Sequence, residues 1–192
     1  MKFRQLAVFG AVALVCSFAV VARSAETGKE RYERAKPALE KAKLTLEQGV
    51  EAAMKKVPEG KAVEAETKLE QGRAIFEVEM VSGTEHREVR IDAATGEVLS
   101  VEEQPESRKN KRELEEEKTE NEAATTSKTT LAEAIQIARE EVKNGKAFDV
   151  CFHRRNGKLA VGVELFDGSM IKAVHIDPQT GKVLEVKEES IK

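Results

Sequence analysis

One stretch of this 192-residue chain is repeated further along the sequence. Residues 45–103 align without a gap with residues 130–188, a shift of 85 positions, and about 20 of the 59 aligned pairs are identical. The most similar part is an eight-residue segment that reads DAATGEVL from Asp92 and DPQTGKVL from Asp177. Identity in this order at one fixed shift indicates a duplicated structural unit. We therefore expect the chain to fold as two copies of one small unit.

Each copy has the pattern of one helix followed by short strands. Thr45 and Thr130 are each followed three residues later by Gln or Glu, which is the pattern of a capping box at a helix start. Apolar residues then recur at helical spacing, and beyond them apolar and charged residues alternate as in half-buried strands. Turns such as Asn156-Gly157 separate these strands. The pattern predicts an α+β fold of two tandem small domains, each with a helix packed on a roughly four-stranded antiparallel sheet.

The domain boundaries follow from the repeat and from the composition around it. Residues 1–24 have the pattern of a signal peptide, and residues 25–44 form a charged, partly helical lead-in. The two domains span residues 45–103 and 129–192. Residues 104–128 between them are mostly Glu, Lys, Arg and Asn. This composition fits either a solvated charged linker or a single charged helix.

The N-terminus has the features of an export signal. Lys2 and Arg4 precede an apolar run over residues 6–22, and the small residue Ser24 offers a cleavage position. The apolar run is also close to the shortest length that spans a membrane, so a retained N-terminal anchor is the alternative. We expect a periplasmic or secreted bacterial protein that contacts a membrane only if this segment is retained.

Composition and motifs argue against several classes of function. Charged residues make up 35% of the chain with both signs mixed, which is unlike the basic surface of a nucleic-acid-binding protein. The sequence lacks an H-E-x-x-H zinc motif, a Gly-x-Ser-x-Gly nucleophile motif and a phosphate-binding glycine loop. Beyond the signal, Cys151 is the single cysteine, so an internal disulfide is excluded. We expect no catalytic residues and no cofactor.

Three residues of the second copy are weak candidates for a copper or zinc site. Cys151 and His153 lie two residues apart on a predicted strand and therefore share a face. His175 lies on the third strand of the same copy, and Gly162 leaves room on the strand between them. The simpler interpretation is that all three are ordinary polar residues of an exposed sheet face. His86 is not repeated in the second copy.

The repeated loop is interpreted as a folding device. An Asp side chain can accept backbone amides two or three residues further on, and a Gly can adopt the positive φ needed before the last strand. These residues are Asp92, Thr95 and Gly96 in the first copy, and Asp177, Thr180 and Gly181 in the second. One Asp per loop offers too few oxygens for calcium. The leucines that follow, Leu99 and Leu184, are expected in the core.

The end of each copy is similar to a known family. The pattern Val-x-Ile-Asp-x-x-Thr-Gly-x-Val-Leu occurs at residues 89–99 and 174–184, after a capped helix and alternating strands. This arrangement resembles the PepSY domain, which is named for peptidase propeptides and a spore-germination protein. The resemblance implies an extracytoplasmic, non-enzymatic domain of a kind thought to restrain a peptidase. Since no peptidase sequence follows copy two, we expect such restraint to act in trans.

These observations favour an exported binding module whose partner is an extracytoplasmic protein, for example a peptidase. Binding would occlude a cleft or add a strand to a sheet edge. The outward side chains of Glu77, Glu79 and Glu164 would favour a basic partner. One alternative is a structural or sensory envelope protein that forms a homodimer through sheet edges, and a minor alternative is the handling of copper or zinc.

Overall fold

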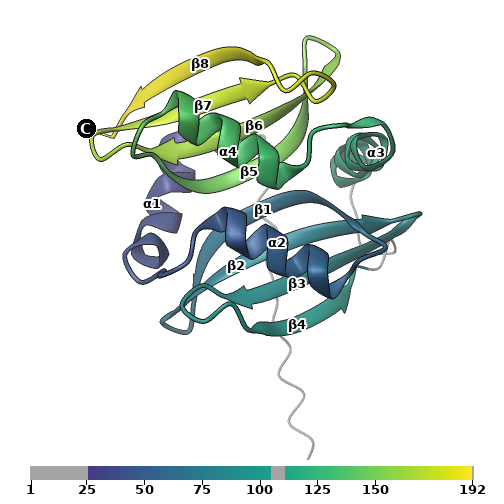
Figure 1. Cartoon of the computed structure of the whole chain (residues 1–192), viewed down its shortest axis with the longest axis horizontal. Helices are drawn as coiled ribbons and strands as arrows, with labels where there is room; N and C mark the ends of the chain where they lie inside the picture. Colours follow the sequence, from purple (N-terminus) through teal and green to yellow (C-terminus); the bar gives the residue numbers. More distant parts are fainter. Residues whose placement is uncertain (1–25, 105–110, 192) are drawn as a thin grey trace, which may run out of the picture.

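The computed structural model describes residues 26–104 and 111–191, and it shows one sheet built from both repeats (Figure 1). The strand order is β4-β3-β2-β1-β5-β6-β7-β8, with every neighbouring pair antiparallel. In chain order the strands are β1 (Lys61–Glu70), β2 (Arg73–Ser82), β3 (Glu85–Asp92), β4 (Val98–Glu103), β5 (Lys146–Arg155), β6 (Lys158–Phe166), β7 (Met170–Ile176) and β8 (Val183–Ser190). The predicted signal peptide lies outside the described residues.

Two equivalent helices cover one face of this sheet. They are α2 (Leu46–Lys56) and α4 (Leu131–Glu141), and they also pack against each other (Figure 1). Each begins with the predicted capping box: the hydroxyls of Thr45 and Thr130 accept the backbone amide three residues further on, and the side chain at that position accepts the amide of the Thr. The apolar stripe of each helix meets the apolar face of its own four strands, and this contact forms the main core.

The two repeats are joined edge to edge through β1 and β5. In this pairing Ala65 lies directly opposite Val150, and these two residues are equivalent in the 85-residue repeat. The repeats are therefore related by an approximate twofold axis that passes between them. The expectation of two separate four-stranded sheets is corrected to one eight-stranded sheet. The two sheets join because β1 and β5, the inner edge strands of the two repeats, form backbone hydrogen bonds with each other.

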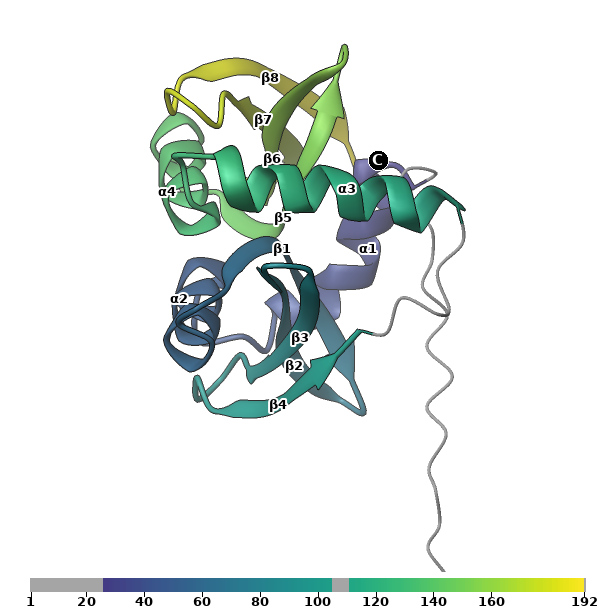
Figure 2. The same ribbon diagram turned by 90° about the vertical axis from the view of Figure 1, so that its right-hand side faces the viewer.

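The segments before each repeat form two further helices that flank this joint. They are α1 (Gly28–Leu39) and α3 (Lys111–Thr126), which are equivalent under the same shift. In Figure 1 they lie on opposite sides of the β1–β5 pair, and Figure 2 shows α3 running across the joint. α1 contacts β1 and β2 of its own repeat and β5, β7 and β8 of the second, while α3 contacts β5 of its own repeat and β1 and β2 of the first. Each leading helix thus bridges the two repeats, and most of the predicted linker is helical.

The prediction that Leu99 and Leu184 enter the core is wrong. Their exposed fractions are 39% and 54%. In β4 the register shifts so that Ser100 faces Arg90 while Val98 faces Ile91, which leaves Leu99 as the extra residue of a β-bulge. The same shift occurs in β8 around Leu184. A bulge turns its extra residue out of the simple alternation, so both leucines point away from the core.

No helix in the described ranges is long and apolar enough to cross a membrane.

Candidate functional site

The sheet face away from α2 and α4, here called the far face, carries a row of titratable side chains. Residues that lie opposite each other on neighbouring strands point to the same side of a sheet. The strand pairings therefore define one row across all eight strands. From β4 to β8 this row is Glu102, Glu88, Glu79, Glu64, Cys151, Gly162, His175 and Glu185. Its first half is acidic and its second half holds the cysteine and a histidine.

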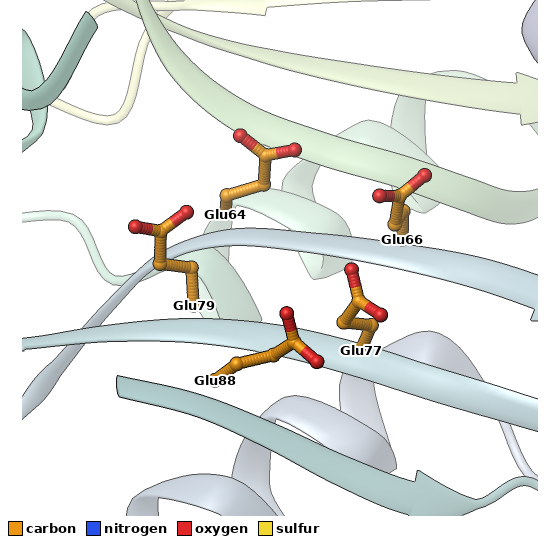
Figure 3. Close-up of a pocket in the computed structure, with 5 residues that line it drawn as sticks. All are labelled: Glu64, Glu66, Glu77, Glu79 and Glu88. Carbon is orange, nitrogen blue, oxygen red and sulfur yellow. The ribbon is translucent and has the colours of Figure 1, made fainter. Parts of the chain in front are cut away.

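The first repeat's half of the far face contains a small cavity lined by carboxylates. Its volume is about 30 Å³, and the carboxylates come from β1, β2 and β3 (Figure 3). The lining residues are Glu64, Glu66, Glu77, Glu79 and Glu88. Such a space holds one or two water molecules, which makes it too small for an organic substrate.

Cationic side chains from α1, β1 and β3 partly neutralise these carboxylates, and Arg34 of α1 lies 3.3 Å from Glu66. Nζ of Lys68 lies 2.7 Å from Glu66 and also contacts Glu77, while Arg90 lies 2.6 Å from Glu88 and 3.6 Å from Glu77. Burial raises the pKa of Glu77 to about 7, because the attraction of Lys68 is outweighed by burial together with the repulsion of Glu88 and Glu66. The network therefore holds a carboxyl group that ionises near neutral pH.

The glutamates expected to attract a basic partner are engaged within the molecule. Glu164 is 8% exposed and its carboxylate accepts a hydrogen bond from Nε of Arg31 in α1 at 2.9 Å. Glu79 lies 2.9 Å from Nδ1 of His86, and Glu77 belongs to the network with Lys68. The partner of Glu164 comes from α1, which the strand pattern alone does not reveal.

The predicted group in the second repeat occupies the equivalent place on the far face. The rings of His153 and His175 lie 5.1 Å apart above Gly162, where an added Cβ would lie 3.0 Å from the His153 ring. The glycine therefore makes the room that the sequence suggested. Cys151 lies opposite Gly162 on β5. Burial, with the nearby His153 and Arg155, lowers the pKa of His175 to about 4. His175 is thus neutral at ordinary pH.

A cluster that sequence reasoning missed lies at the start of β3. His86 is 3% exposed, and its ring lies between Glu79 of β2 and two glutamates of α3, Glu117 and Glu120. In the described part of the chain, Glu79, His86 and Glu120 are the group whose three ligand atoms all lie within 4.8 Å of one another. Cys151, His153 and His175 do not form such a group. The one available signal was that Glu117 and Glu120, three residues apart, would share a helix face.

The repeated loops have the hydrogen bonds of tight turns. Asp92 accepts the amides of Ala94 at 2.8 Å and Thr95 at 3.1 Å. Asp177 accepts the equivalent amides at the same distances. Gly96 and Gly181 have φ values of 78° and 68°. The amides that bond to Asp92 lower the pKa of its carboxyl group. These contacts account for the repeated residues by the geometry of the turn.

The two outermost strands leave open sheet edges that carry apolar side chains. In the described residues β4 pairs with β3 and β8 pairs with β7, and neither has a strand on its other side. The exposed fractions of Leu99, Val101 and Leu184 on these strands are 39%, 38% and 54%. An open edge with exposed apolar residues is a ready template for an extended peptide.

Comparisons with known proteins agree with the repeat. The family described as "Peptidase propeptide and YPEB domain" (PepSY) matches residues 43–102 and 128–187. A similar solved structure is that of a "putative lipoprotein" from Clostridium difficile 630, which is 19% identical, with a TM-score of 0.43, over 77% of this chain and 95% of that chain. No curated protein matches the sequence. The two matches together cover more than half of this chain. The chain therefore belongs to the PepSY family and contains two tandem copies of the domain.

Proposed function

We propose that this protein is an exported, non-enzymatic binding module that holds an extended segment of another extracytoplasmic protein at its open sheet edges. Membership of a family named for peptidase propeptides supports binding as the function and makes a peptidase the first partner to test. The N-terminal pattern of Lys2, Arg4 and an apolar run supports export.

The observation that carries the proposal is the exposed apolar surface of β4. Leu99 and Val101 are each more than one third exposed on a strand that has an unpaired outer side among the described residues. Exposed edges of this kind are usually protected by charge, proline or a covering segment. A partner strand would bond to the open backbone of β4, and its side chains would contact these two residues. The acidic residues Glu102 and Glu103 at the end of β4 favour a basic partner segment.

Strand addition predicts a defined change in the backbone of β4. The test exposes the purified protein to a panel of extracytoplasmic peptidases and measures loss of peptidase activity with increasing protein concentration. For each peptidase that binds, hydrogen exchange of the β4 amides is measured with and without the partner. We expect inhibition together with slower exchange in β4. Binding that leaves β4 exchange unchanged would contradict strand addition, and absence of binding across the panel would contradict peptidase restraint.

A matched pair of variants separates the edge from general surface effects. Leu99→Lys with Val101→Lys places charge on the open edge, whereas Leu69→Lys places it at the end of β1, where the side chain is 37% exposed. We expect the β4 double variant to lose binding and the Leu69 variant to keep it. Sedimentation of the protein alone tests the second candidate, self-association: a dimer that the same double variant dissociates would favour the structural role.

A further inference from the structure

The buried cluster around His86 has a composition that the fold itself does not require. Under the repeat, His86 corresponds to Ile171, Glu117 to Tyr32 and Glu120 to Ala35. Ile171, Tyr32 and Ala35 pack together as one buried apolar cluster between α1 and the second repeat. The same contact between a leading helix and a sheet is thus apolar in one repeat and made of one imidazole and two carboxylates in the other. Packing therefore does not explain the polar version.

The ligand atoms at His86 are spaced as they would be around one metal ion. Nδ1 of His86 lies 2.9 Å from Oε1 of Glu79 and 3.6 Å from Oε2 of Glu120. Donor atoms at the usual ~2.1 Å from a tetrahedral zinc ion are themselves about 3.4 Å apart. These two separations lie on either side of that value, and the ligand atoms of Glu79 and Glu120 lie within 4.8 Å of each other, so side-chain rotations would bring all three atoms onto one ion. We propose that Glu79, His86 and Glu120 bind a divalent transition-metal ion, with Zn²⁺ as the best match to one imidazole and two carboxylates.

The other nitrogen of the ring supports this assignment. Nε2 of His86 lies 3.3 Å from Oε1 of Glu117, one helical turn before Glu120. The two atoms lie close without hydrogen-bond geometry. A rotation of the Glu117 carboxylate would let it accept a hydrogen bond from Nε2, which would fix the ring and leave the free electron pair of Nδ1 for the ion. A divalent cation bound by the two carboxylates and Nδ1 would displace any proton from that nitrogen.

The position of the site assigns the ion a structural role and offers it a route of entry. Glu79 and His86 belong to β2 and β3 of the first repeat, whereas Glu120 belongs to α3. A bound ion would therefore hold α3 against the sheet. A cavity of about 390 Å³ lies beside the cluster and includes His86 in its lining, together with Thr84, Glu85, Glu103 and Gln104. A hydrated ion can reach the imidazole through this space.

The test is zinc titration of the purified protein after removal of metal with a chelator, followed by calorimetry and by metal analysis of the dialysed sample. We expect one zinc ion per chain. His86→Ile introduces the residue type of the equivalent Ile171, and Glu120→Ala introduces that of the equivalent Ala35. Each substitution should weaken zinc binding by about a hundredfold or more. Glu117→Gln should weaken it about tenfold without abolishing it. Replacing both His153 and His175 by alanine should change nothing.

Two results would overturn the proposal. One is zinc uptake that stays the same in the His86 and Glu120 variants, and the other is uptake that is lost only in the His153 and His175 double variant. Circular dichroism without metal verifies that each variant is folded, and Glu120→Ala on the helix keeps the test decisive if His86→Ile fails to fold. Hydrogen exchange gives a second readout, because zinc should slow exchange in α3 of the unmodified protein and not in Glu120→Ala.

Discussion

Tyr32 provides the most direct test of the packing of α1 against the second repeat. It lies in α1, before the first repeat, yet its ring is 4.4 Å from that of Phe166 and 5.6 Å from that of Phe148, both in the second repeat. Its exposed fraction is 3%. A tyrosine ring buries about 150 Å² or more, which at about 25 cal/mol per Å² corresponds to nearly 4 kcal/mol. Allowing for the cavity left behind, Tyr32→Ala should reduce the free energy of unfolding by about 3–5 kcal/mol.

The assay is urea unfolding followed by circular dichroism, with hydrogen exchange to locate the effect. Exchange should accelerate first in β5, β6 and β7, the strands of the second repeat that hold Phe148, Phe166 and Ile171 beside the ring. Tyr32→Phe keeps the ring and should change the free energy of unfolding by less than about 1 kcal/mol. A loss below about 1 kcal/mol for Tyr32→Ala, or faster exchange confined to β3 and β4, would refute the packing of α1 on the second repeat.

Three further predictions concern stability and can be measured by urea unfolding. Gly49→Ala should reduce stability by about 1–3 kcal/mol, because its new Cβ would lie 2.5 Å from the ring of Phe76, and a gain of about 1 kcal/mol in helix propensity does not offset this clash; equal or higher stability would show that the ring moves freely. Since the pKa of His175 is lowered to about 4, the unfolded chain takes up a proton first, so its contribution to stability is lost as pH falls from 6.5 towards 4, and His175→Gln should flatten this decline. Asp92→Ala removes the acceptor of two backbone amides and should reduce the free energy of unfolding by about 1–2 kcal/mol. Because the pKa of this carboxyl group is lowered in the folded protein, its stabilising contribution is lost as the group is protonated, so the difference from the unmodified protein should shrink in acid.

Features set by neighbouring residues could be predicted from the sequence. Thr45 and Thr130 mark helix starts because the capping box needs only residues three positions apart. Asn156-Gly157 marks a hairpin because both residues adopt positive φ, 49° and 77°, as the tight turn demands. The repeat itself establishes two equivalent units. Leu99 shows where local reasoning stops, because one extra residue in a strand reverses the side to which it points.

Features set by contacts between distant segments could not be predicted. Alternation in β1 shows that one side is buried but does not identify β5 as its neighbour. Tyr32 lies in the charged lead-in segment, and the sequence of that segment does not indicate that its ring packs against the second repeat. The neighbours of His86 could not be identified from its own strand, since Glu79, Glu117 and Glu120 come from another strand and from α3. The pairing of Glu164 with Arg31 of α1 was hidden for the same reason.

Because each leading helix also contacts the other repeat, neither half buries all of its surface by itself. If a protease cut the chain between residues 104 and 111, each fragment would lack the helix that seals part of it and would expose one long unpaired strand. The two fragments should recombine without a covalent link, in the way that identical subunits assemble around a twofold axis. The tandem chain is in this sense a dimer with its two subunits covalently linked. The link keeps the effective concentration of each half near the other high at any dilution.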